Sequence, residues 1–563
     1  MSITKLSNEQ LQSALQTAQN VNFFGKRLRE RQLAICDDII EGFELSQQDV
    51  TSSVLCDWLL ENRPVKPKAE KAASENKLAA DTMTGEATKK LESLAVKGGH
   101  CFIVTTAQNN TVPSSVFGQL VALSEHLEGE LIVLPVHYNK GAFSAAVEDD
   151  KEFFDPAIKP YLVDSDCWLE AKNLVRLMPS ANVLPTAKLP VNAGRDLNAG
   201  ELVTIIPATK QQMLTKPRMP QQPISEVWTT GACTAFNYTA TRAGSEAEKQ
   251  HVFGGLLVRI DSRGQVDVTN IRQGDNGELQ IMPYRDSEYA VLIDNAGAVY
   301  DTSLCDSIVV LGDLHCEMQD PIVYSKTLEW LKKSSPSVVA LHDILHFETR
   351  SHHNRKSGKH LYKMQTLGQT VLQDLTKVIS QVNEIAETCS EVYIVESNHN
   401  SALDNWLDDS AYNPKNDPIN AKLYYLLNYA LCEAIDAGMD KTAIEIALTD
   451  AAFSSCLPAI ADNVVFGSMG SSKVAHGWEI SQHGHKGQNG SMGNTTLFSK
   501  WNVKLVTGHT HSPMIVGDAV TVGVMAKLDQ GYNKGGASSW NHANAVIHPN
   551  GTVQLVRVTP LTL

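Results

Sequence analysis

The sequence predicts an α/β protein of several domains, and three observations support this class. The chain has 563 residues, which is more than one hydrophobic core usually organises. Its content of 42% hydrophobic and 20% charged residues is ordinary for a soluble globular protein. From about residue 98 onward, short apolar segments typical of buried strands alternate with segments of helical spacing. We therefore expect α/β layers preceded by a small helical part.

Residues 1–63 predict a small helical module. Ser7 and Gln10 have the spacing of a capping box at a helix N-terminus. A second helix is expected after Gly25 and a third over residues 50–60. The second of these segments is rich in Lys and Arg, which leaves two interpretations open. The module could bind DNA or support assembly, or it could be a plain helical bundle with a solvated charged face.

The middle of the chain predicts a linker and an accessory domain. Residues 64–97 contain almost no large apolar side chains, so they predict a linker or a loosely held helix. Residues 98–300 predict an α/β accessory domain that begins with a strand, a helix and a second strand (CFIVTT, SSVFGQLVALSEHL and ELIVLPV). This segment carries no catalytic signature. We expect it to shape a substrate groove or a contact between copies of the chain.

Residues 301–563 contain the main functional signal. Four apolar segments each run directly into a polar cluster, and they read SIVVLGD, VVALHD, EVYIVESNH and VKLVTGHTH. In open α/β sheets, ligand sites form beyond the carboxyl ends of the strands. We therefore expect the side chains that follow these strands to converge on one site.

The polar side chains of this segment suit a pair of metal ions. They are Asp313, His315, Asp343, Asn398, His399, His483, His485, His509 and His511. Carboxylate and amide oxygens mixed with imidazole suit Mn²⁺, Fe or Zn²⁺ better than Ca²⁺. In extended chain, the D-x-H and H-x-H spacings place two side chains on one face. One such pair alone is usually an ordinary polar pair, but five clusters in order predict a dinuclear metal site.

The order of these clusters resembles the calcineurin-like metallophosphoesterase superfamily, including its nuclease branch. The family pattern runs G-D-x-H, G-D, G-N-H-D/E, a His, and G-H-x-H. This chain reads GDLH at 312–315, HD at 342–343, SNHN at 397–400, HGH at 483–485 and GHTH at 508–511. The resemblance covers roughly residues 305–560. It implies that residues 301–563 form a sandwich of two mixed β-sheets flanked by helices.

The resemblance also implies a role for each matching residue. One metal ion would be held by Asp313, His315 and His511, and the second by Asn398, His483 and His509. Asp343 would bridge the two ions, and His399 would act on the phosphoryl group or the leaving oxygen. His485 competes with His483 as a ligand, and the family pattern favours His483. Two Mn²⁺ ions are expected, with Mg²⁺, Fe and Zn²⁺ as alternatives, and they would activate a water for attack on phosphorus.

Three positions depart from the family pattern. His342 replaces the Gly before the bridging Asp, Ser397 replaces the Gly before Asn398, and Asn400 replaces the acid after His399. These residues lie beside the expected ligands. They put the surroundings and orientation of His399 in doubt, while metal binding stays predicted.

The segment after Asp343 favours DNA as the substrate. It reads HFETRSHHNRKSGKHLYKMQ and includes Arg350, Arg355, Lys356 and Lys359, in a chain of net charge −15. A local basic patch beside the metals is what a phosphate backbone requires. The length and motif variants also look similar to the early DNA-degrading proteins of large tailed coliphages. A phosphatase or small-molecule or cyclic-nucleotide phosphodiesterase remains the enzymatic alternative, and a metal-binding scaffold without catalysis remains the other.

The sequence favours a cytoplasmic protein. Its N-terminus has no apolar core typical of a secretory signal, and no apolar run approaches the length of a membrane span. The ten Cys are scattered without C-x-x-C pairs, which predicts reduced thiols. No membrane partner is expected, while a homo-oligomer remains open. If a phage encodes the chain, the compartment is the cytoplasm of the host bacterium.

Overall fold

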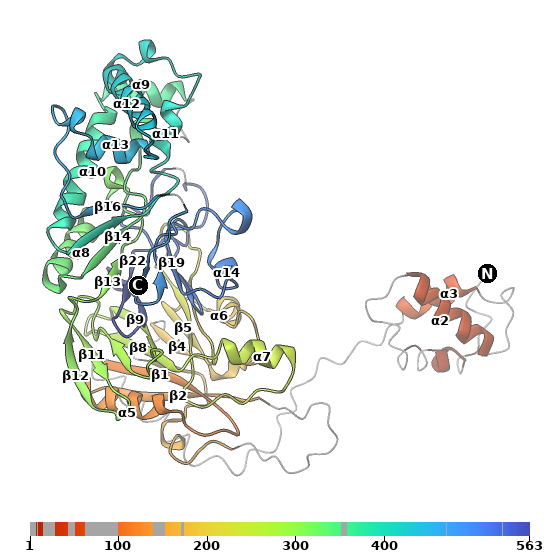
Figure 1. Cartoon of the computed structure of the whole chain (residues 1–563). Coiled ribbons are helices and arrows are strands. Elements are labelled where there is room, and N and C mark those ends of the chain that lie inside the picture. Colours follow the sequence, from red (N-terminus) through yellow and green to blue (C-terminus); the bar gives the residue numbers. More distant parts are fainter. Residues whose placement is uncertain are drawn as a thin grey trace. The chain divides into compact units, whose positions relative to one another are not determined.

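The computed structural model describes most of the chain as two compact units (Figure 1). The described residues are 7, 10–14, 18, 29–42, 51–61, 100–138, 153–169, 174–350, 357–468, 470–531 and 533–562. The first unit spans Met1–Ala80 and the second Asp81–Leu563. The expected linker over residues 64–97 lies outside the described residues.

The first unit contains the helices α2 (Arg29–Gly42) and α3 (Ser52–Glu61). A small shared core forms where Cys36 and Ile40 of α2 meet Leu55 and Leu59 of α3. The predicted capping box is present, because the side chains of Ser7 and Gln10 each accept a hydrogen bond from the main-chain N–H of the other. The predicted helical character of this unit is therefore confirmed in its described parts.

The second unit is mixed α/β, which confirms the predicted fold class. Its strands before residue 305 are β1 (His100–Gln108), β2 (Glu130–Val136), β3 (Cys167–Leu169), β4 (Val175–Leu177), β5 (Val203–Ile206), β6 (Gln211–Thr215), β7 (Glu226–Thr230), β8 (Gly254–Ile260), β9 (Val266–Arg272), β10 (Leu279–Ile281), β11 (Tyr289–Ile293) and β12 (Val299–Ser303). Its later strands are β13 (Ile308–Val310), β14 (Val338–Leu341), β15 (Glu391–Ile394), β16 (Val464–Phe466), β17 (Val474–Ala475), β18 (Trp478–Glu479), β19 (Leu505–Thr507), β20 (Met514–Val516), β21 (Ala519–Thr521), β22 (Ala543–Ile547) and β23 (Val553–Arg557). Its helices are α5 (Ser115–His126), α6 (Val191–Leu197), α7 (Arg242–Lys249), α8 (Pro321–Ser334), α9 (Gly358–Thr366), α10 (Val371–Ala386), α11 (Ala402–Leu407), α12 (Pro418–Asp436), α13 (Ala443–Thr449) and α14 (Thr495–Phe498).

The central sheet has the strand order β16-β15-β14-β13-β22-β23. Its strands β13, β14, β15 and β16 run parallel, and β22 pairs antiparallel with β13. Three of the four segments predicted to end in polar clusters are strands of this parallel set, namely β13, β14 and β15. Their carboxyl ends therefore meet at one edge of the sheet.

Alternate residues of the central sheet enter two different cores. Ile308 and Val310 of β13 pack in a core shared with the large sheet, whose strand order is β17-β18-β19-β21-β20-β6-β7-β5-β4-β3. Val309 and the following Leu311 face the opposite way, into a core shared with helices. This period of two is the ordinary alternation of a strand buried on both faces. It places the central sheet between a helical layer and the large sheet.

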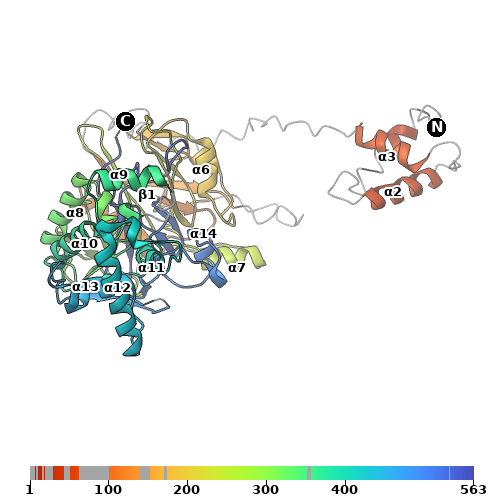
Figure 2. The ribbon, with the colours of Figure 1, turned by 90° about the horizontal axis from the view of Figure 1, so that it is seen from above.

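The helical layer covers one face of the central sheet. Side chains of α8, α10, α12 and α13 share the core of Val309 and Val339. Figure 1 shows α8 and α10 beside β13 and β14, and Figure 2 shows α8, α10, α12 and α13 grouped on the same side of the unit. The helix α10 begins with a capping box formed by Thr370 and Gln373. The long helices thereby fix the connections between the strands that carry the polar clusters.

Strands from the expected accessory segment join those of the C-terminal segment. The strand β6 pairs with β20, with Met213 opposite Ile515, so both sides of the boundary expected near residue 300 contribute to the large sheet. The strand–helix–strand predicted from Cys101 to Val136 is present as β1, α5 and β2, and β1 and β2 pair in parallel. All ten Cys lie among the described residues, and none of them forms a disulfide. Among the described residues, no helix has the length and apolarity needed to span a membrane.

Candidate metal centre

Four of the predicted ligands occupy strained backbone. His315, Asp343, His509 and His511 have φ values of 42°, 41°, 75° and 57°, in the left-handed region that side-chain-bearing residues rarely adopt. Each such residue costs about 1–3 kcal/mol and persists only where the surroundings enforce it. The concentration of strained residues at the ends of β13, β14 and β19 therefore indicates a functional site at this edge.

Main-chain hydrogen bonds hold two of these turns against each other. Beyond the end of β13, the main-chain N–H groups of Leu314 and His315 donate to the carbonyls of His342 and Asp343. Asp313 is fixed from the other side, where its N–H donates to the carbonyl of Gly523. The two acidic residues that follow β13 and β14 are thus held in one register.

The first group of side chains consists of Asp313, His315, Asp343 and His511. All four are buried, and one ligand atom from each lies within 4.8 Å of the others. The Nε2 atoms of His315 and His511 are 3.0 Å apart, and Nε2 of His511 is 3.0 Å from Oδ2 of Asp313. Nε2 of His315 is 3.8 Å from Oδ2 of Asp343. Two carboxylates and two imidazoles therefore converge on one point.

The second group consists of Asn398, His483 and His509. Oδ1 of Asn398 lies 2.9 Å from Nε2 of His483 and 3.1 Å from Nδ1 of His509. Nε2 of His483 is also 3.2 Å from Oδ2 of Asp343. Since the same Asp343 oxygen faces His315 of the first group, Asp343 stands between the two groups. The structure thus brings together all seven residues predicted as ligands.

His485 lies beside the second group. Its ring centroid is 5.4 Å from that of His483 and 6.0 Å from that of His509. His483 makes the close contact with Asp343. The structure therefore places the ring of His483, and not that of His485, in contact with Asp343.

The electrostatics of the cluster favour ionised carboxylates, neutral imidazoles at His315 and His509, and a protonated imidazole at His483. Burial, followed by the nearby His399, sets the pKa of His315 well below its ordinary value. Burial also lowers the pKa of His509. Although burial raises the pKa of Asp343, the surrounding imidazoles, His483 first, outweigh it and hold that pKa well below its usual range. The carboxylates of Asp343 and Asp313 raise the pKa of His483 against the effect of its burial.

Orphaned polar atoms test whether the residues fit metal ions. Oδ2 of Asp343 is buried and counts as having no hydrogen-bond partner within the described part of the chain, although Nε2 of His483 approaches it to 3.2 Å. Buried polar atoms normally have partners, so such orphans call for a ligand. Nitrogen and carboxylate donors that converge from both sides on Asp343 are the donor set of divalent transition metals. The residues therefore fit two divalent cations, whose identity the donor set leaves open.

His399 lies at the rim of the first group. Its main-chain N–H donates to Oδ1 of Asp343 at 3.2 Å, and its ring centroid is 4.6 Å from that of His315. Its ring also stacks on His346, with centroids 5.6 Å apart and an interplanar angle of 19°. His399 is therefore held beside the cluster.

His346 is a site residue that the sequence reasoning missed. It forms a second possible metal-holding group with His315 and His399, and its Nδ1 is 3.4 Å from Nδ1 of His315. Its Nε2 is 3.3 Å from a carboxylate oxygen of Glu348. The signal was its position three residues after Asp343 in the segment HDILHF, where it follows a strand like the other ligands.

The three departures from the family pattern surround the ligands. His342 is buried with its Nδ1 3.4 Å from Nδ1 of His483, and burial lowers its pKa to about 4. The hydroxyl of Ser397 accepts from the main-chain N–H of Asn400. The side chain of Asn400 in turn accepts from Leu345 and donates to Val395. These residues tie the turn of Asn398 to the turn of Asp343.

The residues predicted to bind DNA differ in burial, and two of them lie outside the described residues. Arg350 is buried, and its Nε donates to Asp417 at 2.8 Å, so its guanidinium joins two segments of the protein and is not presented to a phosphate. Lys359 is exposed on α9. Arg355 and Lys356 lie outside the described residues. The structure thus corrects the expectation for Arg350, because the arginine is neutralised inside the fold.

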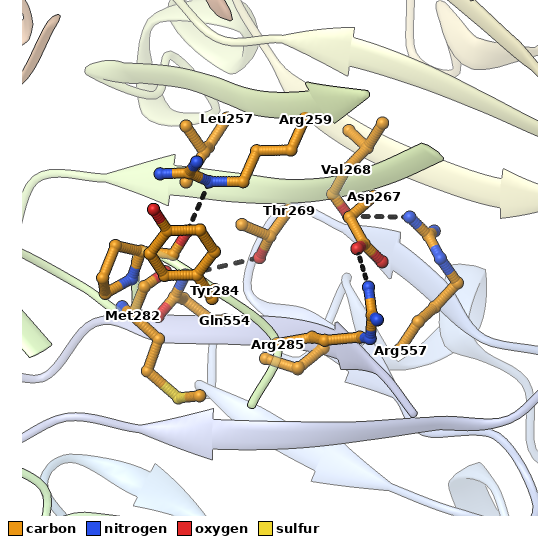
Figure 3. Close-up of a pocket in the computed structure, with 12 residues that line it drawn as sticks. Leu257, Arg259, Asp267, Val268, Thr269, Met282, Tyr284, Arg285, Gln554 and Arg557 are labelled. Atoms are coloured by element: carbon orange, nitrogen blue, oxygen red, sulfur yellow. Dashed lines mark hydrogen bonds and ion pairs between the residues drawn. The ribbon is translucent and has the colours of Figure 1, made fainter. Parts of the chain in front are cut away.

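A polar cavity elsewhere in the unit contains none of these residues (Figure 3). In it, Arg259 stacks on Tyr284 at 3.8 Å, and Arg285 is paired with Asp267. Arg557 donates to the carbonyl of Val268. The cavity has a volume of about 30 Å³, which is room for one or two waters. Its charges are largely paired, so we regard it as part of the packing between strands.

One curated relative matches the chain along nearly its whole length. A protein of Escherichia phage T5 named Protein A1 is 33% identical over 580 residues, which cover 98% of this chain and 98% of the relative. No protein-family model and no solved structure matches the chain. The similarity to a phage protein agrees with the coliphage resemblance seen in the sequence.

Proposed function

We propose, from the premise that the chain belongs to the family of Protein A1 of Escherichia phage T5, that the chain is a metal-dependent phosphodiesterase that degrades DNA. The relative's name states no activity, so the proposal depends on the histidine–carboxylate cluster. One observation carries it. A single oxygen of Asp343 faces His315 on one side and His483 on the other. A carboxylate shared by two nitrogen-rich groups is what a two-metal hydrolytic site requires.

In this proposal, Asp313, His315 and His511 hold one divalent cation, and Asn398, His483 and His509 hold the other. When bound, the two ions supply an activated water and offset charge on the phosphate oxygens. Mn²⁺ is the expected ion. The family resemblance to calcineurin-like metallophosphoesterases supports this assignment, and so does the α/β layer in which three ligand-bearing strands run parallel.

The protein's own residues would position the ester and move the proton. Asp313 accepts hydrogen bonds from the main-chain N–H of His509 at both carboxylate oxygens, which fixes the carboxylate on its turn. The ring of Trp540 lies 4.2 Å from that of His511 and shields it on one side. His399, held by its N–H bond to Asp343 and by stacking on His346, would donate a proton to the leaving oxygen.

A nuclease assay with purified full chain tests the proposal. The chelator-stripped protein is reloaded with Mn²⁺ or Mg²⁺ and incubated with end-labelled linear DNA, circular DNA and p-nitrophenyl phosphate. An Asp313→Ala variant purified in parallel detects contaminating nucleases. We expect metal-dependent cleavage of DNA that the variant lacks. Hydrolysis of the monoester alone would indicate a phosphatase, and metal binding without hydrolysis of any ester would indicate a scaffold.

A further inference from the structure

A second cavity lies between the end of β6 and the loop that leads into β22. Its volume is about 250 Å³, and its lining includes Arg218, Asp529, Lys534, Gly535, Gly536 and Ser538. Arg218 and Ser538 bind each other through both main-chain hydrogen bonds. The cavity is therefore a built part of the fold, closed on one side by a two-residue bridge.

Short contacts connect this cavity to the candidate metal centre. The hydroxyl of Ser539, next to the lining residue Ser538, is 2.7 Å from that of Ser512, next to His511. Trp540 follows, with its ring 4.2 Å from the ring of His511, and the N–H of Asn541 donates to the carbonyl of His511. The cavity thus begins within a few residues of a predicted ligand.

Arg218 brings an unneutralised cation to the cavity. Its Nη1 donates to the carbonyl of Gln222 at 3.3 Å, and its Nε is buried without a hydrogen-bond partner within the described residues. No described carboxylate pairs with it, in contrast to Arg350, which Asp417 neutralises. Desolvation of the guanidinium lowers the pKa of Arg218. An arginine held half-buried in this way presents donors suited to an anion.

The loop of Lys534, Gly535 and Gly536 in the lining offers main-chain donors and a second cation. A Cβ added at Gly535 or Gly536 would meet nothing within 4 Å, so the main chain is open to an incoming group. No hydrogen bond from the N–H of either glycine is made to a described residue. Lys534 lies 3.6 Å from Asp529, and both side chains are more than half exposed, so their attraction is weak. Lys534 can therefore turn to a phosphate at little cost.

We propose that this cavity binds the phosphate of a neighbouring nucleotide when the scissile phosphate of a nucleic-acid strand lies at the metal centre. The inference rests on the proposed function and deepens it, because it makes the substrate a strand. Arg218, Lys534 and the N–H groups of Gly535 and Gly536 would hold the second phosphate. Trp540, between the two phosphates, offers an aromatic ring on which a base can stack. Small esters reach only the metal centre and lose this contact.

The test compares a strand with a small diester in the Mn²⁺-loaded full chain. The substrates are a short single-stranded deoxyoligonucleotide and bis(p-nitrophenyl) phosphate. In Arg218→Ala, we expect the ratio of kcat/KM for the oligonucleotide to that for the diester to fall about tenfold or more. Arg218→Lys should recover part of the loss. The exposed substitution Lys534→Glu, which leaves the core intact, should lower the same ratio. Arg263→Ala, at an exposed arginine paired with Asp261, is the control.

A binding measurement separates this inference from the proposed function. Fluorescence anisotropy with the same labelled oligonucleotide should show weaker binding in Arg218→Ala and Lys534→Glu, with a salt dependence shallower by about one phosphate contact. An unchanged ratio together with unchanged binding would overturn the inference. So would an equal loss on both substrates, which would mean that Arg218 only supports the fold. If the native protein hydrolyses neither substrate, the proposed function fails. The binding comparison still shows whether the cavity contributes to binding of the strand.

Discussion

At the scale of single residues, the candidate centre depends on side chains that lie at positions of strained backbone. His315, Asp343, His509 and His511 all adopt positive φ, and each could be replaced by glycine with less strain. The positive φ values turn the chain at these residues, so that the donor atoms point toward one another and not along the strands. Bound cations would offset the charge of Asp313 and Asp343, which are both buried.

The role of His399 gives a prediction at this scale. In His399→Ala, we expect the metal content to stay at two ions per chain while turnover falls by about 10²–10⁴-fold, the usual contribution of a proton donor. Inductively coupled plasma mass spectrometry measures the ions, and the nuclease assay measures turnover. His126→Ala, at a surface histidine near Asp301, serves as the control. Loss of both ions in His399→Ala would show that His399 is a ligand.

The sequence predicts which polar residues converge, but it predicts the residues that support them poorly. The seven predicted ligands follow strands in a fixed order, so their types and spacing can be recognised in the sequence alone. His346, Trp540 and the Arg350–Asp417 pair depend on contacts between distant segments, which no local pattern records. Arg350 in particular looks like a surface cation in the sequence because its partner lies 67 positions away.

At the scale of elements, two of the turns that carry predicted ligands have a glycine at which two segments approach closely. The N–H of Gly312 donates to the side chain of Asn544 on β22, at 2.9 Å. Gly508, at the end of β19, leaves room for the carboxylate of Asp313. A Cβ at Gly508 would lie 2.1 Å from Oδ1 of Asp313 and 3.1 Å from Cγ of His342.

Gly508→Ala should therefore weaken metal binding. The added methyl group would push the Asp313 carboxylate from its position, and we expect the affinity for Mn²⁺ to fall about 10–100-fold, the range seen when ligand positioning is disturbed. Isothermal titration calorimetry measures the change. Gly118→Ala, in the middle of α5 with open space around it, should keep the native affinity and stabilise the fold by up to ~1 kcal/mol. Equal affinities in the two variants would contradict the close contact at Gly508.

The hairpin of β22 and β23 gives a prediction about pH. His548 follows β22, is fully buried, and donates to Oε1 of Gln554 at 2.7 Å. Burial lowers its pKa to about 4 from an ordinary value of 6.5. The unfolded chain therefore binds more protons than the folded chain between these values, so stability is present above pH 6.5 and falls as pH falls toward 4.

His548→Gln should remove this part of the pH dependence. Between pH 7 and pH 5, the free energy of unfolding of the native protein should fall by about 2 kcal/mol more than that of the variant. Urea unfolding at the two pH values measures the difference. His126→Gln should keep the native slope. The same slope in native protein and His548→Gln would show that His548 gains its proton in the folded state.

At the scale of the whole molecule, residues 100–562 act as one layered body in their described parts, although the sequence suggests a boundary near residue 300. Individual strands and helices such as β1, α5 and β2 are readable from their apolar spacing. The pairing of β6 with β20 cannot be predicted in this way, because it depends on tertiary packing between segments some 300 residues apart. The large sheet thereby attaches the early strands to the part that carries the candidate metal centre.

Because the predicted ligands that follow β13, β14, β15 and β19 meet at one point, bound metal ions should stabilise this whole body. Removing them with EDTA should lower the melting temperature by several degrees, and Mn²⁺ should restore it. At a metal concentration of 100 times Kd, the expected stabilisation is about 2.7 kcal/mol for each bound ion. Differential scanning calorimetry measures the shift. Superimposable melting curves with and without EDTA would mean that the cluster holds no ion that stabilises the fold.

The most direct test of the two-metal centre is anomalous diffraction at the manganese edge from crystals grown with Mn²⁺. We expect two peaks, one among Asp313, His315 and His511 and the other among Asn398, His483 and His509, with Asp343 in contact with both. A map with no peak at this cluster, or with manganese bound only elsewhere, would contradict the account.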